Sequence, residues 1–243
     1  MTGMPSSPTV EVAVPSPLRF LLPARDRAAG LRRLRWDPDA TAGHVVESAG
    51  IPLTEVGSLE IDGAPAERDA RPGPGSRIAV VEVPRPEPAP ARGFLLDVGL
   101  GSLARRLRLL GVDAAWSDDA DDASLVDRAN AEDRVLLTQD RGLLRRRALL
   151  RGALVRGAGA DDQLADVLDR FAPPLAPLTR CTACGGSLEP VSRESVAHRL
   201  EPGTLRTQEH FARCPDCDRV YWHGAHGQRI DVIIRSAQAA RGR

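Results

Sequence analysis

The sequence contains no lysine, so all 33 of its basic side chains are arginines. This absence excludes a Walker-type phosphate-binding lysine, a Schiff base and a lysine general base. GC-rich codon usage is the simplest explanation for it. Acidic side chains also number 33, so the chain as a whole has no excess positive charge that would attract a polyanion. Any signal for nucleic-acid binding must therefore come from local clusters of arginine.

Aromatic side chains and long apolar runs are also scarce. An aromatic content of 3% argues against an RNA-binding surface built from stacked Phe and Tyr rings, so shape and phosphate contacts would have to recognise RNA. No window approaches the ~18 consecutive apolar residues of a membrane span. The N-terminal stretch MTGMPSSPTVEVAVPSPLRF has neither a charged leader nor a continuous apolar block. We therefore expect a soluble, cytoplasmic protein with no membrane partner.

Two proline-rich stretches divide the 243 residues into three predicted domains. The stretch VPRPEPAPARG, residues 83–93, is predicted to be a stiff extended spacer rather than part of a core. The second stretch is FAPPLAPLTR, residues 171–180. The predicted domains cover residues 8–84, 93–175 and 178–232.

The first domain is predicted to be a small β-grasp, ubiquitin-like fold. Its strand-like runs are Val10–Val14, Leu31–Trp36, Ser58–Ile61 and Arg77–Val83. A helix is expected between the second and third strands, with Thr41 as its N-cap and Gly50 in the left-handed position after its end. The pair Asp62-Gly63 predicts a tight turn after the third strand. This order of strands, helix and turn is typical of a β-grasp domain.

The middle domain alternates short apolar strands with amphipathic helices. The predicted strands are GFLLDV, DAAW, RVLLT and GALVR. The predicted helices are GSLARRLRLLG, DDASLVDRANAED, RGLLRRRALLR and DDQLADVLDRF, the last beginning at Asp161 or Asp162. This alternation predicts crossover units and a parallel sheet covered by helices on both faces.

Acidic residues follow three strands of this predicted sheet. Asp97 and Asp140 each come where a strand ends, and the strand DAAW runs into SDDADD. In parallel α/β sheets the ligand crevice lies beyond the carboxyl ends of the strands. Carboxylates that converge there raise one another's pKa unless a cation lies between them, and Mg²⁺ and Mn²⁺ prefer carboxylate oxygen. We therefore predict a metal site, holding up to two ions, formed by Asp97, Asp121, Asp122 and Asp140.

These acids also have a simpler interpretation. Asp118, Asp119, Asp121 and Asp122 can cap a helix and complement the positive end of its dipole, as can Asp161 and Asp162. Asp97 and Asp140 fit this alternative less well, because they stand where strands stop rather than where helices need caps.

Clusters of arginine follow both strand-end acids. The helix LARRLRLL comes after Asp97, and the helix LLRRRALLR comes after Asp140. Arginines that leave the same edge of the sheet as the acids can bind the phosphates of a nucleic-acid strand. The predicted RNA-binding residues are Arg105, Arg106, Arg108, Arg145 and Arg146. The alternative is that these arginines form the solvated faces of amphipathic helices.

All four cysteines lie in the C-terminal segment, as Cys181-Thr-Ala-Cys184 and Cys214-Pro-Asp-Cys217. Two such pairs are typical of a tetrahedral zinc site, because each pair supplies two thiolate ligands. A redox dithiol would need a thioredoxin-like context that this turn-rich segment lacks. Four cysteines close the coordination shell, so we predict a structural zinc ion in a zinc ribbon.

Other side chains of this segment allow two interpretations. The histidines are either surface residues or RNA contacts, and one of them can replace a zinc ligand; they are His198, His210, His223 and His226. The pair Tyr221 and Trp222 either contacts RNA or packs on the cysteine pairs.

Five stretches carry a resemblance to a known family. They are FLLDVGLGSLARRLRLLGVD, DDADD, LLTQDRGLLRRR, CTACGG and RCPDCDRVYWHGAHGQR. They resemble the PIN-like RNases related to the C-terminal domain of the Mut-seven exonuclease, which are often fused to an N-terminal ubiquitin-like domain. The resemblance implies an α/β nuclease fold with acidic residues and Mg²⁺ or Mn²⁺, followed by a zinc ribbon. The family's acids carry over to Asp97, Asp121, Asp122 and Asp140.

The sequence departs from the family's pattern at two positions. Gln139 stands where the family usually has arginine, and Asp218 stands where the second cysteine pair is usually followed by glycine. The first domain ends in VPRPEP without a Gly-Gly tail. We therefore expect a module that docks a protein partner or presents RNA, rather than a sulfur carrier or a conjugation tag.

Together these features predict an α/β protein in which a PIN-like parallel sheet flanked by helices follows a β-grasp domain and precedes a zinc ribbon. The predicted function is that of a metal-dependent ribonuclease acting on single-stranded or structured RNA. One alternative is a non-catalytic RNA-binding or ribosome-binding adaptor with a structural zinc ribbon, in which the acids only cap helices. Another is a phosphatase or nucleotidase that acts on small phosphates.

Overall fold

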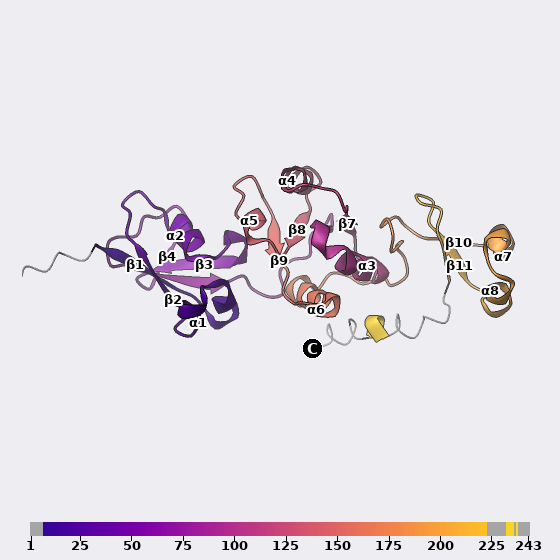
Figure 1. Ribbon diagram of the computed structural model, residues 1–243, viewed down its shortest axis with the longest axis horizontal. Helices are drawn as coiled ribbons and strands as arrows, with labels where there is room; N and C mark the ends of the chain where they lie inside the picture. Colours follow the sequence, from indigo (N-terminus) through magenta and orange to yellow (C-terminus); the bar gives the residue numbers. More distant parts are fainter. Residues whose placement is uncertain (1–6, 223–231, 236, 238–243) are drawn as a thin grey trace, which may run out of the picture. The chain divides into compact units, whose positions relative to one another are not determined.

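The computed structural model describes residues 7–222, 232–235 and 237. The chain forms two compact units, whose elements are labelled in Figure 1. The first unit contains the described residues up to Pro84 together with Asp140–Leu154, and the second contains Arg85–Gln139 and the described residues from Val155 onward. Within these ranges, no helix has both the length and the apolar character needed to cross a membrane.

A five-stranded sheet forms the body of the first unit, in the order β2-β1-β5-β3-β4. Its strands are β1 (Thr9–Ala13), β2 (Leu31–Arg35), β3 (Val56–Ile61), β4 (Ala64–Ala66) and β5 (Arg77–Glu82). Strands β1 and β5 pair in parallel, while β1–β2, β3–β4 and β3–β5 are antiparallel. The predicted β-grasp architecture is confirmed.

Local signals of the sequence determine how this sheet is connected. Helix α2 (Ala42–Ala49) begins after Thr41, whose hydroxyl accepts the His44 N–H at 3.3 Å, and ends before Gly50 with φ of 112°. Asp62 and Gly63 both have positive φ, 52° and 83°, in the turn between β3 and β4. The N-cap, C-terminal glycine and turn predictions are therefore confirmed.

Three short helical segments of the first unit have no predicted counterpart. They are η1 (Ser16–Leu21), α1 (Ala24–Arg27) and η2 (Leu53–Glu55). Each is too short to show a helical repeat of apolar residues. Leu18 and Leu21 of η1 nevertheless lie in the core of the unit, with exposed fractions of 0% and 2%.

The core of the first unit includes side chains from the segment 140–154. Helix α5 (Arg141–Leu144) and strand β9 (Gly152–Leu154) supply Leu144 and Leu154 to the same buried cluster as Val12, Val46 and Ile78. The predicted helix RGLLRRRALLR is therefore wrong beyond Leu144. Packing of its leucines on the β-grasp residues replaces the helical continuation that the local sequence favours.

The second unit contains a parallel sheet flanked by helices. Strand β6 (Phe94–Leu96) lies between β7 (Ala114–Trp116) and β8 (Val135–Thr138), with Leu96 opposite both Trp116 and Leu137. Its helices are η3 (Val98–Leu100), α3 (Gly101–Leu109), α4 (Asp122–Ala131) and α6 (Ala160–Phe171). Helix α6 thus begins just before the predicted Asp161 or Asp162. The predicted α/β class is confirmed.

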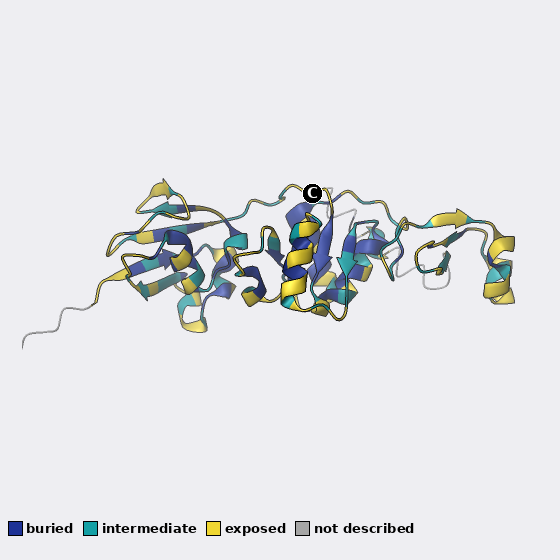
Figure 2. Cartoon of the chain, turned by 90° about the horizontal axis from the view of Figure 1, so that it is seen from above, coloured by how far each residue is buried: buried dark blue, intermediate teal, exposed yellow. Residues whose placement is uncertain are grey.

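Burial explains why these strands read as continuous apolar runs. Every residue of β6 and β8 is buried, as expected for parallel strands covered on both faces. Figure 2 shows the buried residues concentrated inside the units and the exposed ones on helix surfaces and loops. Phe94 and Phe171 pack edge to face with ring centroids 5.1 Å apart, which joins β6 to α6.

The proline-rich stretch after Pro84, predicted to be a stiff extended spacer, is bound to α6 by ion pairs. The Arg85 guanidinium pairs with Asp166 and Asp169 of α6, each at 2.8 Å. Glu87 pairs with Arg170 at 2.5 Å and also donates its backbone N–H to the Arg170 carbonyl. These ion pairs bind the stretch along α6, an arrangement that its proline content alone does not reveal.

A three-stranded antiparallel sheet follows, in the order β10-β11-β12. Its strands are β10 (Glu189–Val191), β11 (Phe211–Arg213) and β12 (Val220–Trp222). The connection from β10 to β11 contains the short helices α7 (Arg193–Val196), η4 (Ala197–Arg199) and α8 (Pro202–Thr207), which the sequence analysis does not predict. This sheet and the four cysteines form a compact ribbon.

Candidate functional site

Asp97 lies at the carboxyl end of β6, the middle strand of the second unit's sheet. Its carboxylate accepts two hydrogen bonds of 2.6 Å, from the Val98 N–H and from the Thr138 hydroxyl. Its backbone N–H donates to the Leu137 carbonyl at 3.0 Å, which extends the pairing of β6 with β8. The side chain is partly exposed. The carboxylate is therefore fixed in position and accessible from the edge of the sheet.

Thr138 is a supporting residue that the sequence analysis misses. It is the last residue of β8 and is fully buried at 0% exposed, yet its hydroxyl bonds to Asp97. A hydroxyl that ends an otherwise apolar strand, VLLT, is the signal that would have revealed it. Hydrogen bonds of this kind hold a metal-binding carboxylate in a single orientation.

The turn after Asp97 is held by Trp116 of β7. The indole N–H donates to the Val98 carbonyl at 3.1 Å, and the ring lies against Gly101, where a Cβ would be 2.6 Å from it. Glycine at position 101 therefore lets the indole pack directly on the start of α3. This packing fixes the route by which the chain leaves the acid.

Asp121 and Asp122 lie at the start of α4. Asp121 is the N-cap, and its carboxylate accepts the Ser124 N–H at 2.9 Å and the Ser124 hydroxyl at 3.1 Å. Asp122 is the first helical residue. The capping role that the sequence analysis gave as the alternative is therefore present at Asp121.

Asp140 follows β8 and belongs to the first unit. It is the N-cap of α5, and its carboxylate accepts the Gly142 N–H at 2.6 Å. Its neighbour Arg141 is held by the β-grasp residues, since the guanidinium donates to the Leu21 carbonyl at 2.9 Å. Asp140 is exposed. Asp140 is thus a cap, as is Asp97 at the start of η3. The expectation that these two acids stand away from helix starts is therefore wrong.

In the parts of the chain that the structure describes, one group of three or more potential ligands has all its ligand atoms within 4.8 Å of one another. That group consists of the four cysteines. Asp97, Asp121 and Asp122 are not part of that group.

The predicted RNA-binding arginines differ in their surroundings. Arg105 is exposed on α3, whereas the Arg106 guanidinium pairs with Asp161 of α6 at 2.8 Å. The prediction for Arg108 is wrong. Its side chain is 1% exposed and donates to main-chain carbonyls, so it cannot reach a phosphate in solution. In the first unit, Arg145 is partly buried and Arg146 is exposed.

Gln139 has a structural role within the second unit. Its side-chain amide donates to the Gly157 carbonyl at 2.8 Å and to the Val155 carbonyl at 3.2 Å. The side chain thus holds the loop that follows β9. These bonds use the amide where the related family usually has a guanidinium.

The four cysteine thiols are arranged as a zinc ion would need them. The Cys181 and Cys217 sulfurs are 3.5 Å apart, and those of Cys184 and Cys214 are 3.4 Å apart. All four are free rather than oxidised, and these separations far exceed the ~2.05 Å of a disulfide. A tetrahedral zinc ion with Zn–S bonds of ~2.3 Å places its sulfurs ~3.8 Å apart. The donor set therefore fits a structural zinc ion.

The two cysteine pairs have the same backbone turn. The Gly185 N–H donates to the Cys181 carbonyl at 2.9 Å, and the Asp218 N–H donates to the Cys214 carbonyl at 2.8 Å. Both residues have positive φ, 90° at Gly185 and 59° at Asp218. Aspartate tolerates this left-handed conformation better than most residues. The second turn therefore keeps its shape although aspartate replaces the family's usual glycine.

The thiols of the cysteine cluster differ in pKa. Burial raises the pKa of Cys181, but hydrogen bonds from the Tyr221 hydroxyl and from backbone N–H groups outweigh burial and lower the pKa to about 6. Burial and the neighbouring thiols raise the pKa of Cys184 to about 12, and burial raises the pKa of Cys217. Four thiolates this close together repel one another, and a divalent cation removes the repulsion.

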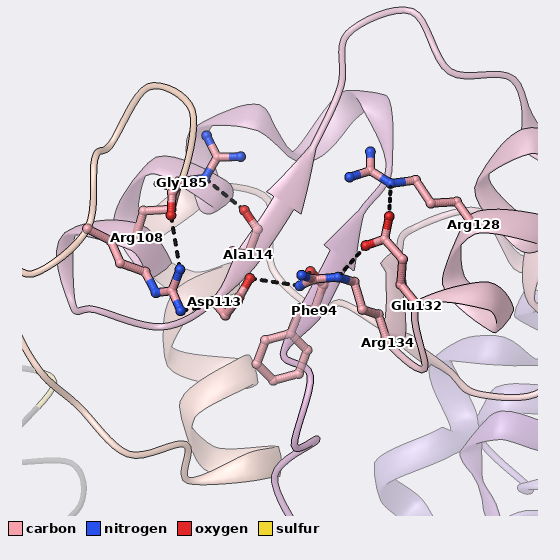
Figure 3. Close-up of polar contacts among 9 residues, drawn as sticks. Phe94, Arg108, Asp113, Ala114, Arg128, Glu132, Arg134 and Gly185 are labelled. Atoms are coloured by element: carbon pink, nitrogen blue, oxygen red, sulfur yellow. Dashed lines mark hydrogen bonds and ion pairs between the residues drawn. The ribbon is translucent and has the colours of Figure 1, made fainter. Parts of the chain in front are cut away.

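Arg108 joins the first cysteine pair to the α/β part of the second unit, and Figure 3 shows its hydrogen bond to Ala114. Its guanidinium donates to the Ala114 carbonyl at 2.7 Å and, on the ribbon, to the Ala183 carbonyl at 2.6 Å and the Thr182 carbonyl at 3.4 Å. Thr182 and Ala183 lie between Cys181 and Cys184. The buried arginine therefore attaches the zinc ribbon to the beginning of β7.

Asp113 provides a second attachment beside Arg108 (Figure 3). One carboxylate oxygen pairs with Arg134 at 2.7 Å, and the other pairs with Arg180 at 3.1 Å. Arg134 precedes β8, and Arg180 directly precedes Cys181. The Arg180 guanidinium also donates to the Gly185 carbonyl at 3.0 Å. The cysteine cluster is thus tied to the loops at the amino ends of β7 and β8.

A groove of about 350 Å³ lies on the ribbon beside the cysteine cluster. It is lined by Thr182, Arg199, Leu200, Arg219, Val220, Tyr221 and Trp222. The Trp222 side chain is 40% exposed, whereas the Tyr221 hydroxyl lies 3.0 Å from the Cys181 sulfur. Tyr221 therefore packs at the cysteine cluster, whereas Trp222 lines the groove.

The structure describes His198 and His210 of the C-terminal segment but not its other histidines. His198 and His210 are exposed, and neither belongs to the group of potential metal ligands. His223 and His226 lie outside the described residues.

Comparison with known families agrees with this architecture. Residues 92–234 match the family model described as the Mut7-C RNAse domain, and residues 7–88 match the model described as Mut7-C ubiquitin. No curated protein and no solved structure matches the chain. The chain therefore belongs to the Mut7-C RNAse family and carries the Mut7-C ubiquitin domain at its N-terminal side.

Proposed function

We propose that the chain is a metal-dependent ribonuclease that hydrolyses RNA phosphodiesters at the carboxyl edge of the second unit's parallel sheet. The observation that carries the proposal is the Asp97 carboxylate, which stands partly exposed at the end of the middle strand and is oriented by Thr138. Carboxylates that bind metal ions are typically held in orientation by hydrogen bonds from neighbouring residues that do not touch the metal. Membership of an RNAse family supports RNA as the substrate.

Asp97, Asp121 and Asp122 of the second unit are the residues that would hold Mg²⁺ or Mn²⁺. Such an ion supplies a water of lowered pKa and positive charge beside the phosphate. In the reaction, the oxygen of water forms a bond to phosphorus, the bond from phosphorus to the leaving sugar oxygen breaks, and that oxygen takes up a proton. Asp97 contributes a fixed negative charge, and the exposed Arg105 on the helix that follows can bind a neighbouring phosphate.

Replacement of Asp97 by asparagine tests the proposal. With Mn²⁺ and a single-stranded RNA pool, Asp97→Asn should reduce cleavage by more than about 100-fold. Loss of a metal ligand weakens metal binding more than loss of a residue that only orients a ligand. Thr138→Val should raise the Mn²⁺ concentration for half-maximal cleavage about 10-fold to 100-fold. Asp118→Asn, an exposed acid outside the proposed ligand set, is the control and should be unchanged.

Circular dichroism should show that each variant folds. Equal cleavage by the wild type and by Asp97→Asn would identify a contaminating nuclease and overturn the proposal.

A second candidate is a non-catalytic RNA-binding adaptor, and the groove on the ribbon favours it. Trp222 offers an exposed indole for base stacking, while Arg199 and Arg219 offer charge for phosphates. One stacked base contributes about 1–3 kcal/mol, so Trp222→Ala should weaken binding of single-stranded RNA about 10-fold or more. This candidate requires RNA binding that falls with salt, persists in a chelator too weak to remove zinc, and is never followed by cleavage under any metal.

A further inference from the structure

The segment 140–154 is folded onto the β-grasp residues of the first unit. Leu144 and Leu154 are each 4% exposed within the β-grasp core, and Leu149 packs against the same cluster. Two leucines of the segment pack against Gly152, since a Cβ there would lie 2.8 Å from the side chains of both Leu144 and Leu149. The β-grasp domain thus completes its core with side chains that come from beyond β8.

A buried carboxylate holds the far end of this segment. Glu55 of η2 is 0% exposed, and its side chain accepts the Leu154 N–H at 2.9 Å. Burial of a carboxylate is unfavourable by several kcal/mol unless hydrogen bonds compensate for it. The buried Glu55 carboxylate therefore requires donors. The Leu154 N–H of β9 is one, and the Thr54 hydroxyl, at 3.3 Å, is another.

An arginine holds the near end of the segment, directly after Asp140. The Arg141 guanidinium donates to the Leu21 carbonyl at 2.9 Å and lies 5.9 Å from the centre of the Phe20 ring. Burial lowers the pKa of Arg141, as do the neighbouring charges of Arg145 and Arg27. Such an arginine is held by its acceptor and by the aromatic face rather than by an acid.

From these contacts we infer that the ubiquitin-like domain is an intramolecular clamp for residues 140–154. Its partner is this chain's own segment, which Arg141 holds at one end and Glu55 holds at the other.

A cut in the chain tests the grip without any measurement of activity. A protease site is inserted between Pro84 and Arg85, and the purified full-length protein is cleaved there. The two fragments should remain together through size-exclusion chromatography, because residues 140–154 of the larger fragment stay in the core of the smaller one. Separation of the wild-type fragments would overturn the clamp and leave a free module for another partner.

Variants of the segment make this test specific. Leu154→Asp, in the cleaved protein, should release the small fragment. Arg141→Ala and Glu55→Gln are milder changes that keep the core intact, and each should speed hydrogen exchange in the peptide containing residues 140–154 at least 10-fold. Arg147→Ala, an exposed change in the same segment, is the matched control and should be unchanged. Equal exchange in all four proteins, including the wild type, would overturn the clamp.

Discussion

Substitution of Arg108 by methionine tests the idea that a buried guanidinium attaches the zinc ribbon to the α/β part. Methionine has a similar length and can occupy the same space, but it cannot donate to carbonyls. Burial lowers the pKa of Arg108, while the nearby Cys184 and Cys181 raise it. The arginine is thus a desolvated cation whose stability depends on its acceptors and on the cysteine cluster.

The expected loss follows from the three carbonyls around Arg108. The bonds to the Ala114 and Ala183 carbonyls are short, 2.7 and 2.6 Å, and the bond to Thr182 is long at 3.4 Å. Each short bond from a charged donor stabilises the fold by about 1.5–3 kcal/mol. Methionine avoids the burial of a charge, which offsets part of that loss. We expect a net decrease of about 2–4 kcal/mol in the free energy of unfolding.

Urea unfolding followed by circular dichroism measures this decrease, and the rate of zinc transfer to a chelator reports on the ribbon. Arg108→Met should release zinc faster than the wild type, because Thr182 and Ala183 lie between two of the ligands. Arg105→Ala, on the exposed side of the same helix, is the control. The reasoning is refuted if both variants unfold within about 0.5 kcal/mol of the wild type, which is the range of ordinary surface changes.

Three further changes have defined outcomes. Cys217→Ser should reduce bound zinc from one ion per chain to a substoichiometric amount by metal analysis, because a complete thiolate shell is needed. Gly93→Ala should lower the melting temperature and destabilise by at least about 2 kcal/mol, since φ is 75° and a Cβ would clash with the Asp113 carbonyl. Asp62→Asn should weaken the dependence of first-unit stability on acid. The Arg77 N–H lowers the pKa of Asp62, so the ionised carboxylate stabilises the folded state. This stabilisation is fully present above the ordinary pKa of aspartate and is lost as pH falls through the lowered pKa of the folded state.

The features that sequence analysis predicts well are those set by neighbouring residues. The cap at Thr41, the glycine after α2 and the turn at Asp62 follow from side-chain and backbone preferences within a few positions. The cysteine cluster is equally clear, because the spacing within each pair meets the geometry of a zinc turn. Even Asp218 preserves that turn, since its backbone adopts the conformation that glycine usually provides.

The features that sequence analysis misses depend on residues far apart in the chain. Arg108 has the spacing of an exposed helix position, but its acceptors Thr182 and Ala183 lie more than seventy positions later. The leucines after α5 favour a longer helix until the β-grasp core accepts them. Asp97 accepts a long-range hydrogen bond from Thr138, and the hydroxyl that ends the apolar strand VLLT is the local sign of it.

The interleaving of residues 140–154 with the β-grasp core bears on how the protein folds during translation. The N-terminal part of the first unit ends at Pro84, but its core also includes Leu144 and Leu154. A ribosome must therefore deliver β6, β7 and β8 before the earlier sheet receives its last apolar side chains. The nascent chain carries that incomplete surface in the meantime, a condition that favours aggregation of stalled or truncated products. A recombinant β-grasp fragment that stops at residue 84 would keep the same defect.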